Sequence, residues 1–266
     1  MFDTLGRVGK AGRRGGEGWR AEWETASGMT ARRAVLPVLP VLVGLFAEGG
    51  IRKGSVVAVE GGAGSTSLLL ALLAGAGGEG AWAAAVGVPL LGLEAAAAAG
   101  VVLERLLVIP RPGGAWPEVA AAMLDSVDMV VLGAPRRCRE VDGRRLTARA
   151  RERRAVLLLE APQSIGGPKG GRETVPSWPG GVDLRLRVER SVWEGTDRGF
   201  GRLQGRRVVV RAWGRGTAAR ERRMELMLPG PDGSIEAVLT PVAGDLTPLR
   251  SYVDLDACAT QETMAG

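Results

Sequence analysis

Short apolar runs alternate with helix-forming runs through the middle of the chain. Five runs rich in Val, Leu and Ala end at or beside Gly or Pro, which is typical of buried strands: residues 54–61, 81–88, 105–110, 128–135 and 155–162. The runs between them favour helices over residues 68–77, 90–100, 116–127 and 143–154. This alternation predicts right-handed βαβ units and an α/β fold with a mostly parallel sheet, and the continuously apolar strands indicate flanking helices on both faces.

The pattern changes after residue 162. Residues 162–181 hold four Pro and six Gly, which predicts a long loop. Residues 182–193 and 206–213 alternate apolar and polar positions with period two, and the turn-rich sequence between them predicts an antiparallel β-hairpin appended to the parallel sheet. Residues 224–239, around a Pro-Asp-Gly turn, predict a last pair of strands.

The two ends of the chain have weaker patterns. Residues 1–28 are rich in Gly and Arg and predict a disordered N-terminal segment, followed by a core domain at 29–243 and a C-terminal tail at 244–266. Met29 is an alternative start. Residues 1–28 show no secretory signal, and the most apolar stretch, residues 35–46, is too short to cross a bilayer. We therefore expect a cytoplasmic protein, with association with the nucleoid as an option.

Composition removes several kinds of chemistry. The 266 residues include no histidine, which excludes histidine general bases, histidine metal ligands and serine–histidine or cysteine–histidine nucleophile pairs. The two cysteines, Cys138 and Cys258, fit neither a disulfide framework nor a paired metal-ligand spacing, so we expect structural or incidental thiols and no metal site.

Positive charge is concentrated in two segments. The net charge is +6 and the sequence pI is about 10.2, with 32 Arg against 3 Lys, a ratio typical of a high-GC genome. Residues 136–154 carry a local excess of six positive charges and residues 198–223 an excess of eight, so the rest of the chain is acidic.

Both segments offer candidate DNA-binding arginines. Arg145, Arg149 and Arg153 follow one another at i, i+4 and i+8, which gives one stripe on a helix that either grips phosphates or is simply solvated. On the hairpin, alternation predicts one exposed sheet face for five arginines, which could serve DNA, an acidic protein partner or solvation alone: Arg185, Arg187, Arg206, Arg207 and Arg211. Trp193 and Trp213, on the same strands, favour core packing, with base stacking as the alternative.

A glycine-rich turn between the first strand and the first helix has the layout of a phosphate loop. The turn comprises Gly61, Gly62, Gly64, Ser65, Thr66 and Ser67. In the standard G-x-x-x-x-G-K-[ST] pattern, the lysine position falls on Ser65 and the first glycine on Val59. The interpretations are a tight turn capped by Ser and Thr, weak nucleotide binding without a dedicated cofactor, or a working hydrolase.

The order of these pieces resembles the core of RecA-type recombinase ATPases. The stretch LFAEGGIRKGSVVAVEGGAGSTSLLLALLAGA, residues 45–76, looks like the family's entry into its first core strand, phosphate loop and first helix. Residues 81–112 follow its second strand, helix and third strand. The resemblance extends over about residues 35–235 and implies a RecA-like fold.

The departures from that family concern its catalytic residues. The resemblance implies a catalytic glutamate at the end of the second strand, where Val86 stands, and a metal-ligating aspartate at the end of the fourth, where Gly133 stands. The lysine is replaced by Ser65, and no replacement acid or base is apparent nearby. The joint loss predicts a pseudo-ATPase rather than an enzyme. The family's two DNA-binding loops correspond to a shortened segment at 136–143 and to the loop at 162–181.

A degenerate core of this kind is similar to the ImuA-prime proteins of actinobacteria, on the stretch GSTSLLLALLAGA. The resemblance implies a non-catalytic accessory of damage-inducible mutagenic translesion synthesis. Its implied partners are an ImuB-like Y-family polymerase homologue and, through it, an error-prone C-family polymerase. The alternatives are a RecA-like DNA-binding ATPase or recombination protein, and a cell-division inhibitor of the SulA type. In the tail, Tyr252 and Leu255 would share one face of a helix formed on a partner, unless the tail is a frayed end.

Overall fold

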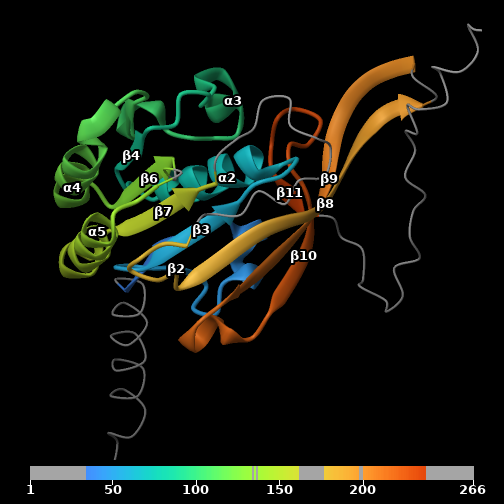
Figure 1. Cartoon of the computed structure of the whole chain (residues 1–266). Helices are drawn as coiled ribbons and strands as arrows, with labels where there is room; N and C mark the ends of the chain where they lie inside the picture. The colour runs from blue at the N-terminus through green and yellow to red at the C-terminus, as the bar shows by residue number, and fades with distance from the viewer. Residues whose placement is uncertain (1–33, 134, 136, 162–176, 198–199, 238–266) are drawn as a thin grey trace, which may run out of the picture.

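A nine-stranded sheet runs through the part of the chain that the computed structural model describes, residues 34–133, 135, 137–161, 177–197 and 200–237 (Figure 1). Its strand order is β11-β10-β9-β8-β3-β7-β6-β4-β5. In chain order the strands are β3 (Val56–Glu60), β4 (Ala83–Val86), β5 (Leu106–Ile109), β6 (Met129–Gly133), β7 (Val156–Glu160), β8 (Leu184–Asp197), β9 (Phe200–Gly214), β10 (Arg222–Met227) and β11 (Glu236–Ala237). The helices are α2 (Ser65–Gly78), α3 (Leu93–Ala98), α4 (Trp116–Ser126) and α5 (Glu140–Arg153).

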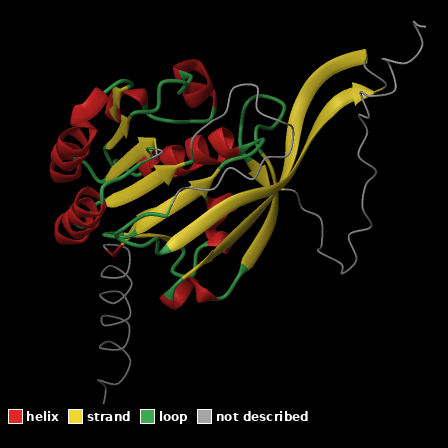
Figure 2. Cartoon of the chain, viewed as in Figure 1, coloured by secondary structure: helices red, strands yellow, loops and turns green. Residues whose placement is uncertain are grey.

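The six strands from β8 to β5 run parallel to one another, which confirms the expected fold class. Helices cover both faces of this parallel part (Figure 2). On one face α2 and α3 pack on a core that includes Val57, Val59 and Leu158. On the other face α4 and α5 pack on a second core, which includes Ala58 and Leu157. Neighbouring residues of one strand thus enter different cores. Every position of β3, β4 and β7 is therefore buried, and these strands are unbroken apolar runs up to their last residues.

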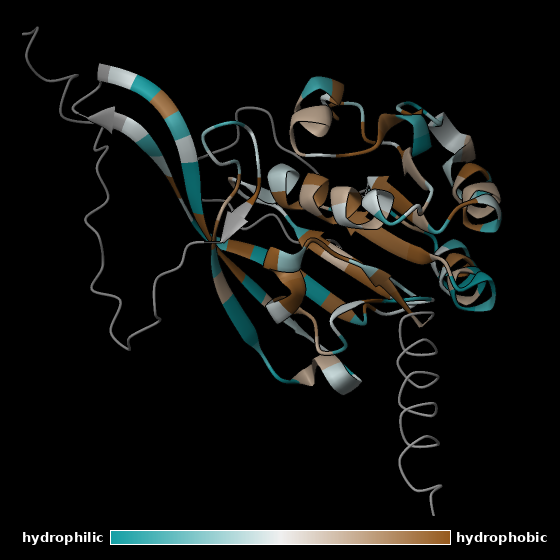
Figure 3. Cartoon of the chain, turned by 180° about the vertical axis from the view of Figure 1, so that it is seen from behind, coloured by the Kyte–Doolittle hydropathy of each residue, from teal (hydrophilic) through white to brown (hydrophobic). Residues whose placement is uncertain are grey.

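The hairpin of β8 and β9 is longer than the sequence predicts. β8 lies parallel to β3 through residues 184–187, and β9 pairs with β8 in antiparallel register and carries β10 on its other edge. Residues 194–197 and 200–205, expected to be turn-rich, continue the two strands instead. We call residues 190–197 and 200–205 the arm, because they stand out from the body as a two-stranded ribbon (Figure 1). Hydrophilic and hydrophobic segments alternate along it (Figure 3).

An N-terminal segment that the sequence pattern leaves unassigned forms two short strands around a 3-10 helix. These are β1 (Val35–Pro37), η1 (Pro40–Leu45) and β2 (Gly50–Arg52), and β1 pairs with β2 in a separate two-stranded sheet. A Cβ on Gly75 of α2 would lie 2.4 Å from the backbone nitrogen of Leu39, so a glycine allows this segment to rest directly on the helix. The segment is apolar because Leu36, Leu42 and Leu45 complete the core on the α2 face.

Several predictions fall on residues that the structure does not describe. They are the disordered segment at 1–28, most of the loop at 162–181 and the tail at 244–266, and they stay predictions. Helix α5 begins at Glu140, three residues before its expected start, and the expected last strand pair is present as β10 and β11.

Candidate functional site

The glycine loop joins β3 to α2 in the way the sequence predicts, but its capping differs. Gly62 and Gly64 have φ angles of +135° and +105°, which side chains other than glycine rarely adopt. The Ser65 amide donates a hydrogen bond to the Gly62 carbonyl at 3.1 Å, and α2 begins at Ser65. The N-cap is Gly64, without a side-chain capping bond, so the expectation of a Ser or Thr cap is wrong.

The hairpin lies directly against this loop. A Cβ on Gly64 would lie 3.2 Å from Val208 Cγ1, 3.5 Å from Val188 Cγ1 and 3.7 Å from Arg206 Cδ. Packing against β8 and β9 therefore gives the glycine at 64 a structural reason in addition to its φ angle. It favours the tight-turn interpretation of the loop, while nucleotide binding stays an untested alternative.

Two of the positions that the RecA resemblance marks as catalytic are closed by packing. Val86 ends β4 and is fully buried between β5 and β6, in register with Ile109 and Leu132. Gly133 ends β6, and a Cβ there would lie 2.1 Å from the carbonyl oxygen of Gly87. Since the obstructing atom belongs to the backbone, an aspartate at this position would require the loop after β4 to move.

The third position, Ser65, is a buried residue in the first turn of α2, 6 % exposed. A cation nevertheless lies near it. The Cδ atom of Arg206 on β9 lies 3.7 Å from the place that a Cβ of Gly64 would take, and burial lowers the pKa of its guanidinium. Arginine keeps its charge through shifts of this kind. Its Nε is buried without a hydrogen bond within the described residues. Sequence spacing gave no signal for this neighbour, since it follows from the strand order.

Two buried acids contradict the expectation that none lies nearby. Glu160 ends β7, is 4 % exposed, and stands in register with Gly133 on one side and Val59 on the other. Alternation along β7 places it on the α2 face of the sheet, because Val156 and Leu158 belong to that core. A carboxylate thus adjoins the position where the resemblance expects an aspartate. The strand order brings it there, so the local pattern around Gly133 could not show it.

The second acid, Glu60, ends β3 on the opposite face. Its side chain is 3 % exposed and forms ion pairs with Arg185, at 2.9 Å, and with Arg187. Burying a carboxylate without compensating charge is costly, so these two β8 arginines serve to neutralise it. They are therefore not free to bind a phosphate.

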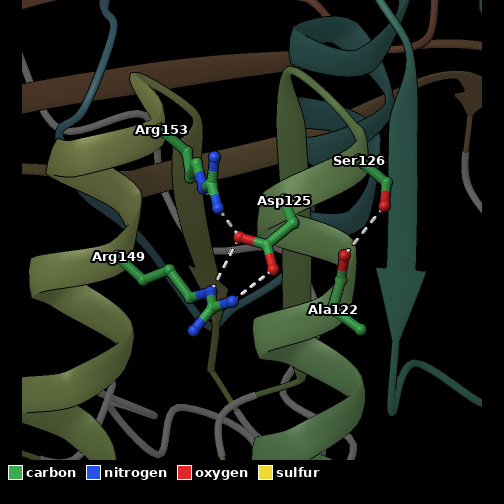
Figure 4. Close-up of polar contacts among 5 residues, drawn as sticks. All are labelled: Ala122, Asp125, Ser126, Arg149 and Arg153. Carbon is green, nitrogen blue, oxygen red and sulfur yellow. Dashed lines mark hydrogen bonds and ion pairs between the residues drawn. The ribbon is translucent and has the colours of Figure 1, made fainter.

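The predicted arginine stripe of α5 faces the neighbouring helix α4. Arg149 and Arg153 both bind Asp125 of α4, with Nε to Oδ1 distances of 2.7 and 2.9 Å (Figure 4). The hydrogen bond from Arg149 holds the pKa of Asp125 below its ordinary value. Arg145 is exposed and makes no ion pair within the described residues. Two of the three stripe arginines thus join helices, and phosphate binding by this stripe stays a prediction.

The five hairpin arginines do not share one sheet face, which corrects the expectation. Arg206 and Arg207 are consecutive on β9 and so point to opposite faces, with Arg206 on the side of Val208 and Val210 in the α2 core. Arg207 pairs with Glu194 and Glu225. Arg211 pairs with Glu189 and Glu221, and its hydrogen bond to Glu221 raises its pKa.

Both hairpin tryptophans have arginines over their rings. Trp213 is half-buried, with the guanidinium carbons of Arg211 and Arg187 at 4.7 and 5.5 Å from its ring centre. Trp193 is 40 % exposed, and Arg206 lies 4.1 Å from its ring centre. Core packing, the favoured interpretation from sequence, is therefore wrong for Trp193.

The other sequence candidates divide between described and undescribed residues. Cys138 is half-buried, and burial raises the pKa of its thiol. Cys258, Tyr252 and Leu255 lie outside the described residues. Within the described ranges, no three His, Cys, Asp or Glu side chains group as metal ligands. The same ranges contain no helix with the length and apolar character needed to span a membrane.

Comparison with known proteins identifies a matching family and a relative. Residues 44–164 match the family model of the MT3502 N-terminal domain. This range holds the glycine loop and strands β3 to β7, and it ends before the hairpin. Uncharacterized protein Rv3395c from Mycobacterium tuberculosis is 37% identical over 160 residues, which cover 57% of this chain and 71% of that protein.

Proposed function

The chain belongs to the MT3502 N-terminal domain family, and from this premise we propose that it is a non-catalytic, RecA-like accessory protein of a mutagenic translesion synthesis complex. In this proposal it acts in the DNA damage response as a scaffold. Its direct partner is an ImuB-like Y-family polymerase homologue, which links it to an error-prone C-family polymerase. The assignment of the process and of the partners comes from the resemblance to ImuA-prime proteins.

One observation carries the non-catalytic part of the proposal. At Gly133, where the resemblance expects a metal-ligating aspartate, the Gly87 carbonyl oxygen lies 2.1 Å from the place of a Cβ. The loop has thus closed over the position. With Val86 buried and Ser65 in place of lysine, the charge clamp, the water-activating acid and the metal ligand of phosphoryl transfer are all replaced at their expected positions.

A RecA-like DNA-binding ATPase is the second candidate, and Glu160 is the observation in its favour. This buried carboxylate lies beside Gly133 at the carboxyl end of the parallel strands, the edge at which ligands bind in α/β sheets. An active enzyme would use Glu160 in place of the missing acid. Arg206, near Gly64, would then stand in for the missing lysine.

Affinity purification from DNA-damaged cells tests the scaffold proposal. The tagged full chain is expected to recover the Y-family polymerase homologue, and a chain ending at residue 246 tests whether Tyr252 and Leu255 dock it. If the tail docks the partner, the shortened chain should no longer recover it, while its unfolding temperature stays the same as that of the full chain. Recovery of a cell-division protein instead of a polymerase would favour the SulA-type alternative, and recovery of neither would overturn the scaffold assignment.

A further inference from the structure

The arm is held to the body only at its base. Strand β3 pairs with β8 no further than Arg187, and β10 pairs with β9 no closer to the tip than Arg207. Beyond these points the two strands of the arm pair with each other, as in the pair Glu194 and Gly205. The arm is therefore a two-stranded ribbon that projects beyond the rest of the sheet (Figure 2).

The charges of the arm are unbalanced once its ion pairs are removed. Glu194 pairs with Arg207, and Glu189, at the base, pairs with Arg211 and Arg223. Exposed Arg190 and Arg202 form no ion pair within the described part of the chain, and neither does Arg206. Of the charged side chains described on the arm and at its base, those left without a counter-charge are all positive. The ribbon therefore favours an anionic partner.

Large apolar side chains lie exposed among these cations. Val192, Trp193 and Leu203 are 46 %, 40 % and 52 % exposed. The Trp193 ring is backed by the Arg206 guanidinium at 4.1 Å, which holds an aromatic surface in place at the base of the arm. Binding of a simple anion would not use exposed aromatic and apolar side chains. A single-stranded nucleic acid would use them, since its unpaired bases stack on aromatic side chains while its phosphates pair with nearby arginines.

We propose that the arm is a binding site for single-stranded DNA. Arg202 and Arg206 contact phosphates on the face that carries Trp193, Trp193 stacks on a base, and Arg190 contacts a phosphate from the opposite face of the ribbon. Single-stranded rather than duplex DNA is inferred because the bases of a duplex are stacked on one another and leave no face for Trp193. The site uses neither the glycine loop nor α5. It goes beyond the scaffold function and does not depend on it, since DNA binding is measured with the purified chain alone.

A charge reversal on the arm provides the first test. The probe is a fluorescein-labelled 20-nucleotide poly(dT), titrated by anisotropy between 50 and 200 mM NaCl against the full chain. R190E/R202E is expected to weaken binding at least about tenfold. It should also reduce the slope of log K against log salt concentration by about 1.4, since each phosphate contact on a single strand contributes about 0.7 to that slope. R111E/R220E is the matched control, because both arginines are exposed, lie away from the arm and give the same change of charge.

Trp193 provides the second test, which separates stacking from charge. W193A is expected to weaken binding by about 5-fold to 150-fold with an unchanged salt slope, and W193F to recover most of the loss. Unfolding temperatures of all variants must match that of the parent chain. Three results would each overturn the proposal. They are an equal loss of affinity in R190E/R202E and R111E/R220E, tighter binding of duplex DNA than of poly(dT), and binding of a 20-residue polyglutamate as tight as that of poly(dT). The last result would assign the arm to an acidic protein instead.

Discussion

Gly133 stands at the position where the RecA resemblance expects a metal-ligating aspartate. The carbonyl oxygen of Gly87, a residue with a φ of +71°, occupies the space that a side chain at 133 would need. An aspartate substituted for Gly133 would therefore not fit the site as it stands. The surrounding backbone would first have to reopen.

The crowding at Gly133 predicts a stability effect. Gly133→Ala should lower the free energy of unfolding by about 1–3 kcal/mol in urea titrations, because its Cβ meets backbone rather than a flexible side chain. Gly78→Ala, in α2 with nothing within 4 Å of its Cβ, is the control and should leave the free energy unchanged or raise it by up to about 1 kcal/mol. Equal stability of the two variants would show that the loop after β4 yields easily.

At the scale of elements, the ion pair between α4 and α5 makes the stability depend on pH. The pKa of Asp125 is lowered in the folded protein, chiefly by its hydrogen bond with Arg149, so folding favours the charged carboxylate. This contribution is complete above the pKa of the unfolded chain and is lost as the pH falls through the lower folded value.

Asp125→Asn should therefore unfold at a lower temperature than the parent at pH 7, and the difference should shrink as the pH falls through the folded pKa of Asp125. The measurement is a series of thermal unfolding curves between pH 7 and pH 2. Glu118→Gln removes an exposed carboxylate from the same helix and should show no such convergence. A difference between Asp125→Asn and the parent that persists at pH 2 would assign the effect to packing rather than charge.

The sequence predicts the parallel strands well because burial on both faces leaves a plain signal, an unbroken apolar run such as residues 156–159. The sequence does not predict the strands of the arm, because glycine occurs both in turns and where two strands approach each other closely. Gly195 suggests a turn, but in the strand a Cβ there would lie 2.2 Å from the Arg202 carbonyl oxygen, so glycine serves close approach.

The sequence predicts less of the candidate site than of the fold. The glycine loop and the three altered positions follow from local pattern and resemblance. The neighbours that define their surroundings, Glu160 and Arg206, come from strands far along the chain. Their approach is a consequence of strand order, which periodicity does not encode.

At the scale of the whole molecule, the purified chain should not hydrolyse ATP. With or without single-stranded DNA, phosphate release should equal that of a buffer blank, because the lysine, glutamate and aspartate positions carry Ser65, Val86 and Gly133. Ordinary enzymes turn over at about 1–10³ per second. A rate within about tenfold of that range that disappears in Glu160→Gln would contradict the pseudo-ATPase proposal and identify the acid that supports catalysis.

Because the arm is attached to the body only at its base, it can be removed as a unit. Replacing residues 194–204 with a two-residue turn would remove backbone pairs that the strands make only with each other, together with the ion pair of Glu194 and Arg207. The ladders to β3 and β10 would remain complete. Insertions, deletions and changes of sequence can therefore accumulate in the ribbon without disturbing the folding of the domain. The length and sequence of this part of the chain are therefore not fixed by the parallel sheet.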